Sequence, residues 1–71
     1  MTMVDKAIEA SFPRPDVLGT FHKFGHFGVN YQVLQPLREA NKSWVVEIEV
    51  LETGERLEYS LEAVLADPEA V

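Results

Sequence analysis

The chain has 71 residues, a formal net charge of -6 and no cysteine. Its length allows one domain with a small core, and the lack of cysteine excludes both a disulfide framework and a thiolate metal site. The acidic excess lies after residue 40, and the six basic residues are scattered, so a nucleic-acid partner is disfavoured.

The first twelve residues do not resemble a signal peptide, because Asp5, Lys6 and Glu9 interrupt the segment where an apolar core would lie. No stretch approaches the roughly 20 apolar residues that span a membrane. We therefore expect a soluble protein of the cytoplasm, a reducing compartment. Since a core of this size supplies only about 3 to 5 kcal/mol of net stability, we also expect a homodimer to add buried surface.

A short helix is predicted near the N-terminus. Val4, Ile8 and Phe12 are four residues apart, which places them on one face of a helix over residues 3–12, and Pro13 ends it. The Pro-Arg-Pro sequence that begins there predicts a stiff extended connector. An arm this short is expected to dock on the rest of the chain or to fray.

After this arm, apolar residues alternate with polar ones, which predicts strands. Four strands are expected, over residues 17–24, 29–35, 43–51 and 56–60. In the third, the glutamates alternate with apolar positions, as in a sheet with one buried face. These apolar positions are Trp44, Val46, Ile48 and Val50. We therefore divide the chain into an N-terminal arm, residues 1–16, and a single β-rich domain, residues 17–71.

The sequence ETGE predicts a turn between the third and fourth strands. The apolar positions of the two strands share a face if Ile48 pairs with Tyr59. The same register places Glu49 opposite Glu58, a like-charge pair that costs up to about 1 kcal/mol on a solvated face.

A short helix is predicted after the fourth strand. Ser60 is a good N-cap, and Leu61, Val64 and Leu65 then share one face. The Asp-Pro sequence that follows ends the helix, because the residue before a proline avoids the helical region. The polar segment at residues 38–43 is interpreted as a loop.

The densest cluster of the chain is FHKFGHFGVNY, which begins at Phe21 and holds four aromatic residues, two histidines and two glycines. Gly25 and Gly28 tolerate positive φ, so the cluster predicts a tight turn between the first two strands. Two registers are allowed: Tyr31 pairs either with Phe21 or with His22.

This turn leaves His26 and Phe27 at a tip that would ordinarily be polar. Under one interpretation Phe27 folds back over the open end of the sheet, and the small size of the core favours this. Under the other, Phe24, Phe27 and Trp44 form an exposed aromatic patch on which a partner side chain or a base stacks. The candidate binding residues are Phe24, His26, Phe27 and Trp44.

The histidines and glutamates do not predict a metal or catalytic site. His22 and His26 have the spacing of helical zinc ligands, but the turn between them breaks the helix and no third ligand is near. Glu47, Glu49 and Glu58 lie on the wet face of the sheet, which does not favour acid–base chemistry. We therefore expect no metal, no other cofactor and no enzymatic activity.

Two stretches of the chain resemble a known family. GTFHKFGHFGVNYQVL contains a glycine-punctuated first hairpin, and ETGERLEYSLEAVLADPEA contains a TGE hairpin and a DPEA tail. Over residues 18–70, these features resemble a family of short uncharacterised bacterial proteins, which implies no function or site. More loosely, four short strands followed by a one-turn helix are similar to SH3-like small barrels. That similarity implies a binding module for peptides, partner subunits or nucleic acid.

The tail ADPEAV is short and polar for the fifth strand of an SH3-like barrel. A partner chain or the N-terminal arm is therefore expected to cover the open edge of the sheet. The whole pattern predicts an α+β domain that is mostly β. We expect a small twisted antiparallel sheet, or an SH3-like roll, of three to five strands, with a short C-terminal helical turn and a helical or frayed N-terminal arm.

The function expected from these observations is that of a non-enzymatic interaction module that binds another protein. The alternative is a nucleic-acid-binding accessory protein that uses the aromatic tip together with Lys23, Arg38 and Lys42. Such a protein would bind nucleic acid less tightly as the salt concentration rises, whereas an apolar protein interface would change little.

Overall fold

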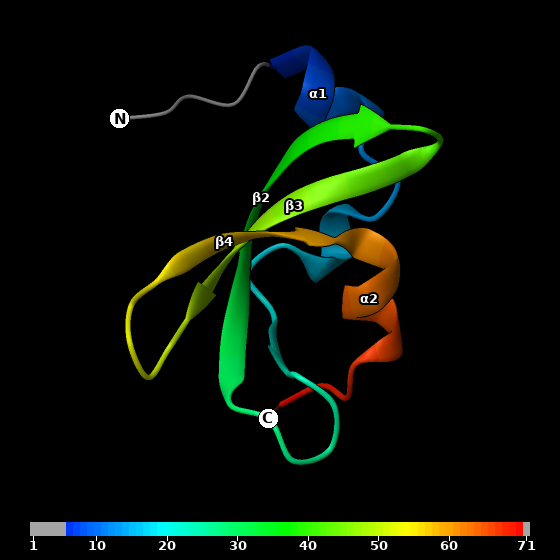
Figure 1. Ribbon diagram of the computed structural model, residues 1–71. Coiled ribbons are helices and arrows are strands. Elements are labelled where there is room, and N and C mark those ends of the chain that lie inside the picture. Colours follow the sequence, from blue (N-terminus) through cyan, green and yellow to red (C-terminus); the bar gives the residue numbers. More distant parts are fainter. Residues whose placement is uncertain (1–5, 71) are drawn as a thin grey trace.

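The secondary structure runs in the order helix, 3-10 turn, four strands, helix, and the computed structural model describes residues 6–70 (Figure 1). The helical elements are α1 (Lys6–Ser11), η1 (Pro15–Val17) and α2 (Leu61–Ala66). The strands are β1 (Phe21–Lys23), β2 (Asn30–Ala40), β3 (Ser43–Val50) and β4 (Arg56–Ser60). They form one antiparallel sheet in the order β1-β2-β3-β4, which confirms the predicted α+β, mostly β fold.

The hairpin of β2 and β3 is longer than predicted. The polar segment at residues 38–43 is not a loop, because both strands continue through it and leave only Asn41 and Lys42 as the turn. Both turn residues have positive φ, 52° and 65°. This geometry fits the right-handed twist of two strands joined by a two-residue turn, so the strands pair up to the turn itself.

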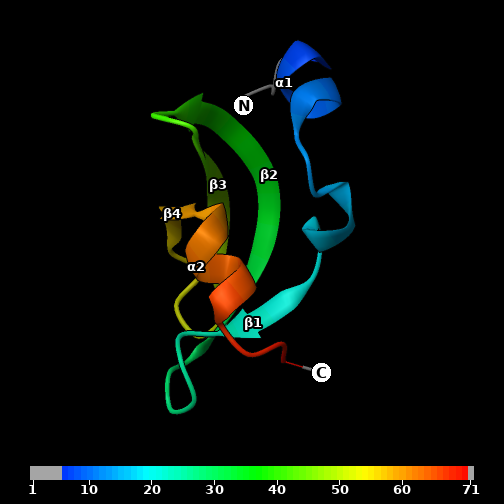
Figure 2. The ribbon, with the colours of Figure 1, turned by 90° about the vertical axis from the view of Figure 1, so that its right-hand side faces the viewer.

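β2 is strongly curved, as Figure 2 shows. Its pairing with β3 shifts register between Val33 and Gln35 and again between Pro36 and Arg38. Pro36 has no N–H to donate, and its side chain is fully buried. An extra residue in one strand bends it locally, so these two irregularities allow β2 to wrap around the core.

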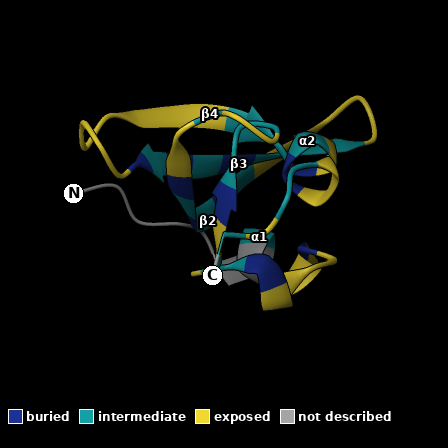
Figure 3. Ribbon diagram, turned by 90° about the horizontal axis from the view of Figure 1, so that it is seen from below, coloured by how far each residue is buried: buried dark blue, intermediate teal, exposed yellow. Residues whose placement is uncertain are grey.

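The core lies on one face of the sheet and is closed by α2 and the N-terminal arm (Figure 3). The predicted inward residues Val46, Ile48 and Val50 are buried, whereas Trp44 is only partly buried and packs edge-on against Phe12, with ring centroids 5.3 Å apart. The core cluster consists of Phe12, Val17, Tyr31, Val33, Val46, Ile48, Leu61 and Val64. Burial of each large apolar side chain contributes about 1.5 to 3 kcal/mol before the entropy cost of folding.

The N-terminal arm docks on the domain. α1 contacts β2, and Phe12, directly after α1, is 5% exposed. The first part of the helix predicted over residues 3–12 lies outside the described residues. Pro15 opens η1 instead of continuing an extended connector, because the fixed φ of proline suits the first position of a helical turn.

β1 covers three residues, fewer than the predicted strand at residues 17–24. Val17 belongs to η1, and the backbone N–H of Thr20 donates to its carbonyl at 3.1 Å. Gly19 has a φ of 85°, a conformation outside the strand region. The chain therefore becomes extended only from Phe21 onward.

The register of β3 and β4 differs by two residues from the prediction. Ile48 pairs with Leu57 and not with Tyr59. The turn is shorter than the predicted register required, since the N–H of Val50 already donates to the carbonyl of Glu55 at 2.8 Å. A shift by two keeps every side chain on its predicted face, so the alternation alone does not distinguish the two registers.

The observed register also changes the charge pairs on the outer face. Glu49 lies opposite Arg56 and forms an ion pair with it at 3.3 Å, in place of the predicted pair with Glu58. Glu58 lies opposite Glu47, and Arg38 contacts its carboxylate at 2.6 Å. The hydrogen bond from Arg38 holds the pKa of Glu58 below its ordinary value. Because these pairs are exposed, they contribute little to stability.

α2 forms as predicted. The hydroxyl oxygen of Ser60 accepts a hydrogen bond from the N–H of Ala63 at 3.1 Å, and Leu61 and Val64 are buried. Leu65, which was expected on the same face, is 46% exposed. Asp67 ends the helix ahead of Pro68.

The open edge of β1 is covered by the C-terminal segment, residues 68–70. The N–H of Lys23 donates to the carbonyl of Pro68 at 3.0 Å, and the N–H of Ala70 donates to the carbonyl of Phe21 at 2.8 Å. Glu69 forms an antiparallel bridge with His22 between them. The expectation that a partner chain or the N-terminal arm covers this edge is therefore wrong. Backbone hydrogen bonds make this contact, and they form whatever the polarity of the side chains in the tail.

Within residues 6–70, no helix is long and apolar enough to cross a membrane.

Candidate functional site

The turn between β1 and β2, the aromatic tip predicted from the sequence, has the second of the two predicted registers. His22 pairs with Tyr31, and the two rings stack with centroids 5.8 Å apart. Phe21 lies opposite Gln32 and is 41% exposed.

The backbone of this turn is fixed from two sides. The N–H of Phe24 donates to the carbonyl of Val29 at 3.2 Å, and the N–H of Gly25 donates to the Asp67 carboxylate at 3.2 Å. Gly25 has a φ of 69°. Gly28 is needed for another reason, because a Cβ placed there would lie 2.1 Å from the carbonyl oxygen of Phe24.

Phe27 projects from the tip and is fully exposed, at 102% of its reference area. It does not fold back over the end of the sheet, so the interpretation favoured by the small core is wrong. His26 beside it is also exposed. The side chain of Phe27 therefore adds nothing to the core, although the turn that carries it is held in place.

The structure does not bring the four candidate residues together. Phe24 packs on Tyr31, with ring centroids 4.5 Å apart, and is partly buried against the core. Trp44 lies next to the turn of β2 and β3, at the other end of the sheet (Figure 1). Of the four candidates, only His26 and Phe27 are exposed.

The three basic residues proposed for nucleic-acid binding are separated as well. Lys23 lies on β1 near the tip, whereas Lys42 forms part of the β2–β3 turn at the opposite end of the sheet. Arg38 forms an ion pair with Glu58. These residues do not form one basic surface around Phe27.

Asp67 connects the tip to the core. Its carboxylate accepts hydrogen bonds from the hydroxyls of Tyr31 at 2.7 Å and Tyr59 at 3.0 Å, in addition to the one from Gly25. Burial raises the pKa of both tyrosine hydroxyls, and the adjacent negative charge of Asp67 raises it further. Both tyrosines therefore stay protonated as donors at neutral pH.

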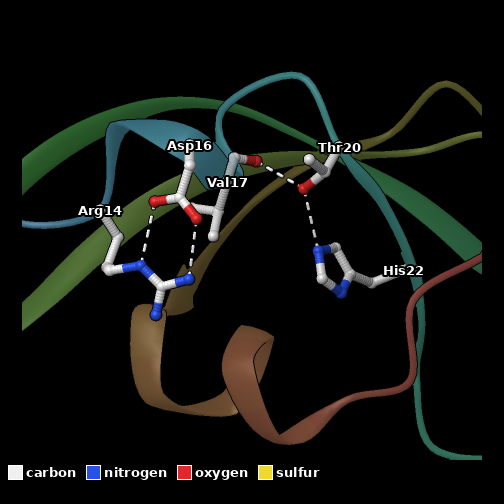
Figure 4. Close-up of polar contacts among 5 residues, drawn as sticks. All are labelled: Arg14, Asp16, Val17, Thr20 and His22. Atoms are coloured by element: carbon white, nitrogen blue, oxygen red, sulfur yellow. Dashed lines mark hydrogen bonds and ion pairs between the residues drawn. The ribbon is translucent and has the colours of Figure 1, made fainter.

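A cavity of about 250 Å³ opens between η1, β1 and the C-terminal segment. Figure 4 shows part of its lining, namely Arg14, Asp16, Val17, Thr20 and His22. We call it the His22 cavity; its lining residues are Arg14, Asp16, Val17, Thr20, His22, Leu65, Asp67 and Glu69.

The hydrogen bonds of His22 determine which ring nitrogen carries the proton. The single hydroxyl proton of Thr20 is donated to the carbonyl of Val17 at 2.5 Å. The contact of 2.9 Å between the same hydroxyl and His22 must therefore use Nε2–H as donor. In the neutral ring Nδ1 is then an acceptor, and it has no partner among the described residues, although His22 is only 7% exposed. A buried unpaired acceptor costs about 1 to 3 kcal/mol.

The charges around the His22 cavity are mostly negative. Arg14 forms two hydrogen bonds with Asp16, of 2.9 and 2.8 Å, which lower the pKa of the carboxyl group. Asp67 accepts only from neutral donors among the described residues and forms no ion pair with any of them. Glu69 has no ion-pair partner within residues 6–70. No group of three His, Asp or Glu side chains in that range is arranged to hold a metal ion.

A family model described as "Family of unknown function (DUF5397)" matches residues 9–71. The chain belongs to this family. The DUF5397 match begins within α1 and includes the aromatic tip, Asp67 and every residue that lines the His22 cavity. It agrees with the predicted resemblance to a family of short uncharacterised proteins. A comparison with curated proteins gives no match.

Sequence reasoning located the tip but missed the His22 cavity and the role of Asp67. The sequence offers His22 as a possible partner of Tyr31 in the sheet and as a metal ligand without a third ligand nearby, and it places Arg14 and Asp16 in the N-terminal arm with its proline connector. Tyr31 and Asp67 are 36 residues apart, so their contact leaves no local pattern. One signal was present: the alternation places Tyr31 and Tyr59 on the buried face, where each hydroxyl requires a partner.

Proposed function

We propose that this DUF5397 protein is a non-enzymatic interaction module that binds another protein through Phe27. The observation that carries the proposal is a fully exposed aromatic ring on a fixed backbone turn. Aromatic side chains are the commonest energetic anchors of protein interfaces, and a rigid turn reduces the entropy lost on binding.

The charge distribution supports a protein partner over nucleic acid. The chain has a net charge of -6, which opposes the approach of phosphates. Of the basic residues in the alternative hypothesis, only Lys23 lies near Phe27. We therefore expect the partner to present an apolar pocket for the ring.

The order of the elements also supports an interaction module. Four antiparallel strands, a short helix and a final segment that hydrogen-bonds back to β1 follow one another as in an SH3-like roll. We further propose that the protein acts in a bacterial cytoplasm, as its cysteine-free composition and its resemblance to short bacterial proteins suggest.

The substitution Phe27→Ala tests this proposal. Because the ring is exposed, the free energy of unfolding should change by less than about 0.5 kcal/mol, while partner binding should weaken by about 1 to 4 kcal/mol. Thermal denaturation measures the first quantity. Affinity capture from a lysate of the native host, quantified by mass spectrometry, identifies proteins whose recovery depends on the ring.

Phe21→Ala is the matched control, since Phe21 is another exposed phenylalanine of the same hairpin but lies in β1 and not in the turn. A protein captured by the wild type and by Phe21→Ala, but lost with Phe27→Ala, would support the proposal. If all three baits capture the same proteins, Phe27 is not the anchor. Recovery of nucleic acid that disappears at physiological salt would favour the alternative function instead.

A further inference from the structure

We propose that β4 pairs antiparallel with β4 of a second copy of this chain, with Leu57 opposite Leu57 and Arg56 opposite Glu58. β4 and β1 are the two outer strands of the sheet, and the tip follows β1. The proposal therefore does not depend on the function proposed above. It rests on the backbone, the apolar face and the charged face of β4, which all favour the same register.

The backbone groups of β4 point outward at alternate residues. The N–H of Val50 donates to the carbonyl of Glu55, and hydrogen-bonded pairs recur at every second residue of an antiparallel hairpin. Leu57, two residues after Glu55, therefore turns its N–H and C=O toward β3. Those of Arg56 and Glu58 point to the outer edge, with which no other strand pairs in the described part of the chain. A second β4 in the proposed register forms its backbone hydrogen bonds between these two residues.

The apolar face of the sheet ends at Leu57. Val33, Ile48 and Leu57 lie side by side across β2, β3 and β4. Val33 and Ile48 are fully buried, whereas Leu57, at the edge, is 38% exposed. In the proposed register the leucine of the second copy continues this row across a two-fold axis. The two leucines form a pair without backbone hydrogen bonds, which brings side chains closest together in an antiparallel sheet.

Opposite charges flank Leu57 on the other face of β4. In the proposed register Arg56 faces Glu58 of the second copy, and the two-fold axis repeats this pair. Within one chain Glu58 lies opposite Glu47, so an arginine on its other side compensates the repulsion between the two carboxylates. The side chains of Arg56 and Glu58 are more than half exposed, so their ion pairs with Glu49 and Arg38 leave them accessible to a second copy.

Neighbouring registers lack this complementarity. A relative shift of two residues in one direction places Glu58 opposite Glu58, and a shift in the other direction places Arg56 opposite Arg56. A shift of one residue sets outward backbone groups of one strand against inward groups of the other, so the hydrogen bonds are lost. The charges on this short edge therefore favour one pairing and oppose the others.

Cysteine substitution tests the register, because the chain has no other thiol. A disulfide requires Cα atoms within about 7 Å, a condition that two opposite residues of adjacent strands meet. Under copper–phenanthroline oxidation, Leu57→Cys should form a covalent dimer at least about tenfold faster than Glu52→Cys, as measured by non-reducing electrophoresis. Glu52 lies in the exposed β3–β4 turn, so its variant reports random collision.

Arg56→Cys and Glu58→Cys are matched variants on the same strand. Each position lies opposite itself in only one of the two shifted registers, so both variants should form covalent dimers more slowly than Leu57→Cys. Faster oxidation of either variant than of Leu57→Cys, or equal rates for Leu57→Cys and Glu52→Cys, would overturn the proposal.

Charge reversal tests the same contact without a thiol. Arg56→Glu and Glu58→Arg each place like charges opposite one another twice in the homodimer, and each should raise its dissociation constant at least about tenfold, measured by analytical ultracentrifugation. An equimolar mixture of the two variants sets opposite charges face to face at both positions, so it should recover the wild-type dissociation constant within about threefold. Glu52→Arg carries the same charge change as Glu58→Arg away from the edge and is the control. Unchanged dimerisation of either single variant, or no recovery in the mixture, would also overturn the proposal.

Discussion

Gly28 lies so close to Phe24 that a Cβ at this position would be 2.1 Å from the backbone carbonyl oxygen. A backbone atom cannot turn away as a flexible side chain can, so the turn must deform to accept alanine. We expect Gly28→Ala to lower the free energy of unfolding by about 3 kcal/mol, measured by urea denaturation.

Gly54→Ala is the control for Gly28→Ala. Gly54 has a φ of 75°, but a Cβ there would have nothing within 4 Å. Its substitution should cost only about 1 kcal/mol, from backbone conformation alone. Equal effects of the two substitutions would show that the close approach of Gly28 to Phe24 does not limit the turn.

The tyrosine hydroxyls bound to Asp67 predict a loss of stability at high pH. Folding raises the pKa of Tyr31 above its ordinary value of 10.0, so the stability linked to its protonated form is complete below pH 10 and declines as the pH rises above it. The urea midpoint of the wild type should therefore fall between pH 8 and about pH 11. Tyr31→Phe should be less stable than the wild type at pH 8, because a hydrogen bond is lost. Its urea midpoint should nevertheless fall less between pH 8 and about pH 11, because the titrating hydroxyl is absent. Parallel pH profiles of the two proteins would contradict this account.

At the scale of secondary structure, the two-residue β2–β3 turn suits the twist of its strands, but its residues disfavour the positive φ that the turn requires. Lys42 has a φ of 65°, which glycine adopts more readily than a residue with a Cβ. We expect Lys42→Gly to raise the free energy of unfolding by about 0.5 kcal/mol, measured by urea denaturation. Lys42→Val removes the same charge but adds a β-branched side chain, so it should destabilise the protein. Stabilisation by both substitutions would mean that the charge of Lys42, and not its φ, determines the effect.

The C-terminal segment shows why edge contacts are hard to infer from composition. Residues 68–70 contain proline and glutamate, which are poor strand formers, yet two backbone hydrogen bonds attach them to β1. α2 and Asp67 hold the segment beside β1, so little further entropy is lost when these bonds form. The position of α2, and not the strand propensity of the tail, decides the contact.

At the scale of the whole molecule, β4 is the last strand of the sheet, and none of the described residues pairs with its outer edge. Arg56, Leu57 and Glu58 are exposed along it (Figure 3). A second copy that pairs with this edge would extend the sheet and bury Leu57, and it would supply the additional burial that a small core requires.

We therefore expect the melting temperature to rise with protein concentration, because association stabilises the folded state by mass action. Differential scanning fluorimetry over a roughly hundredfold range of protein concentration measures this dependence. A constant melting temperature together with a monomer mass in solution would contradict the expected homodimer.

The amino-acid sequence by itself determined that four segments form strands, which face of β3 is buried and where α2 begins and ends, but not the bounds of β1 and β2. Alternation of apolar and polar residues places Val46 and Ile48 inward, and Ser60 and the Asp-Pro sequence define the helix through local backbone contacts. These features depend on neighbours within a few residues, so they can be inferred without the fold.

The tertiary structure alone decided the register of β4, the covering of β1, the exposure of Phe27 and the His22 cavity. Registers that differ by two residues present the same faces, so only the length of the turn separates them. The exposure of Phe27 depends on the anchoring of its turn by Asp67, and the cavity depends on η1, β1 and the C-terminal segment meeting in space. Contacts between residues this far apart in the chain leave no periodic pattern, because they form only after the sheet has brought its ends together.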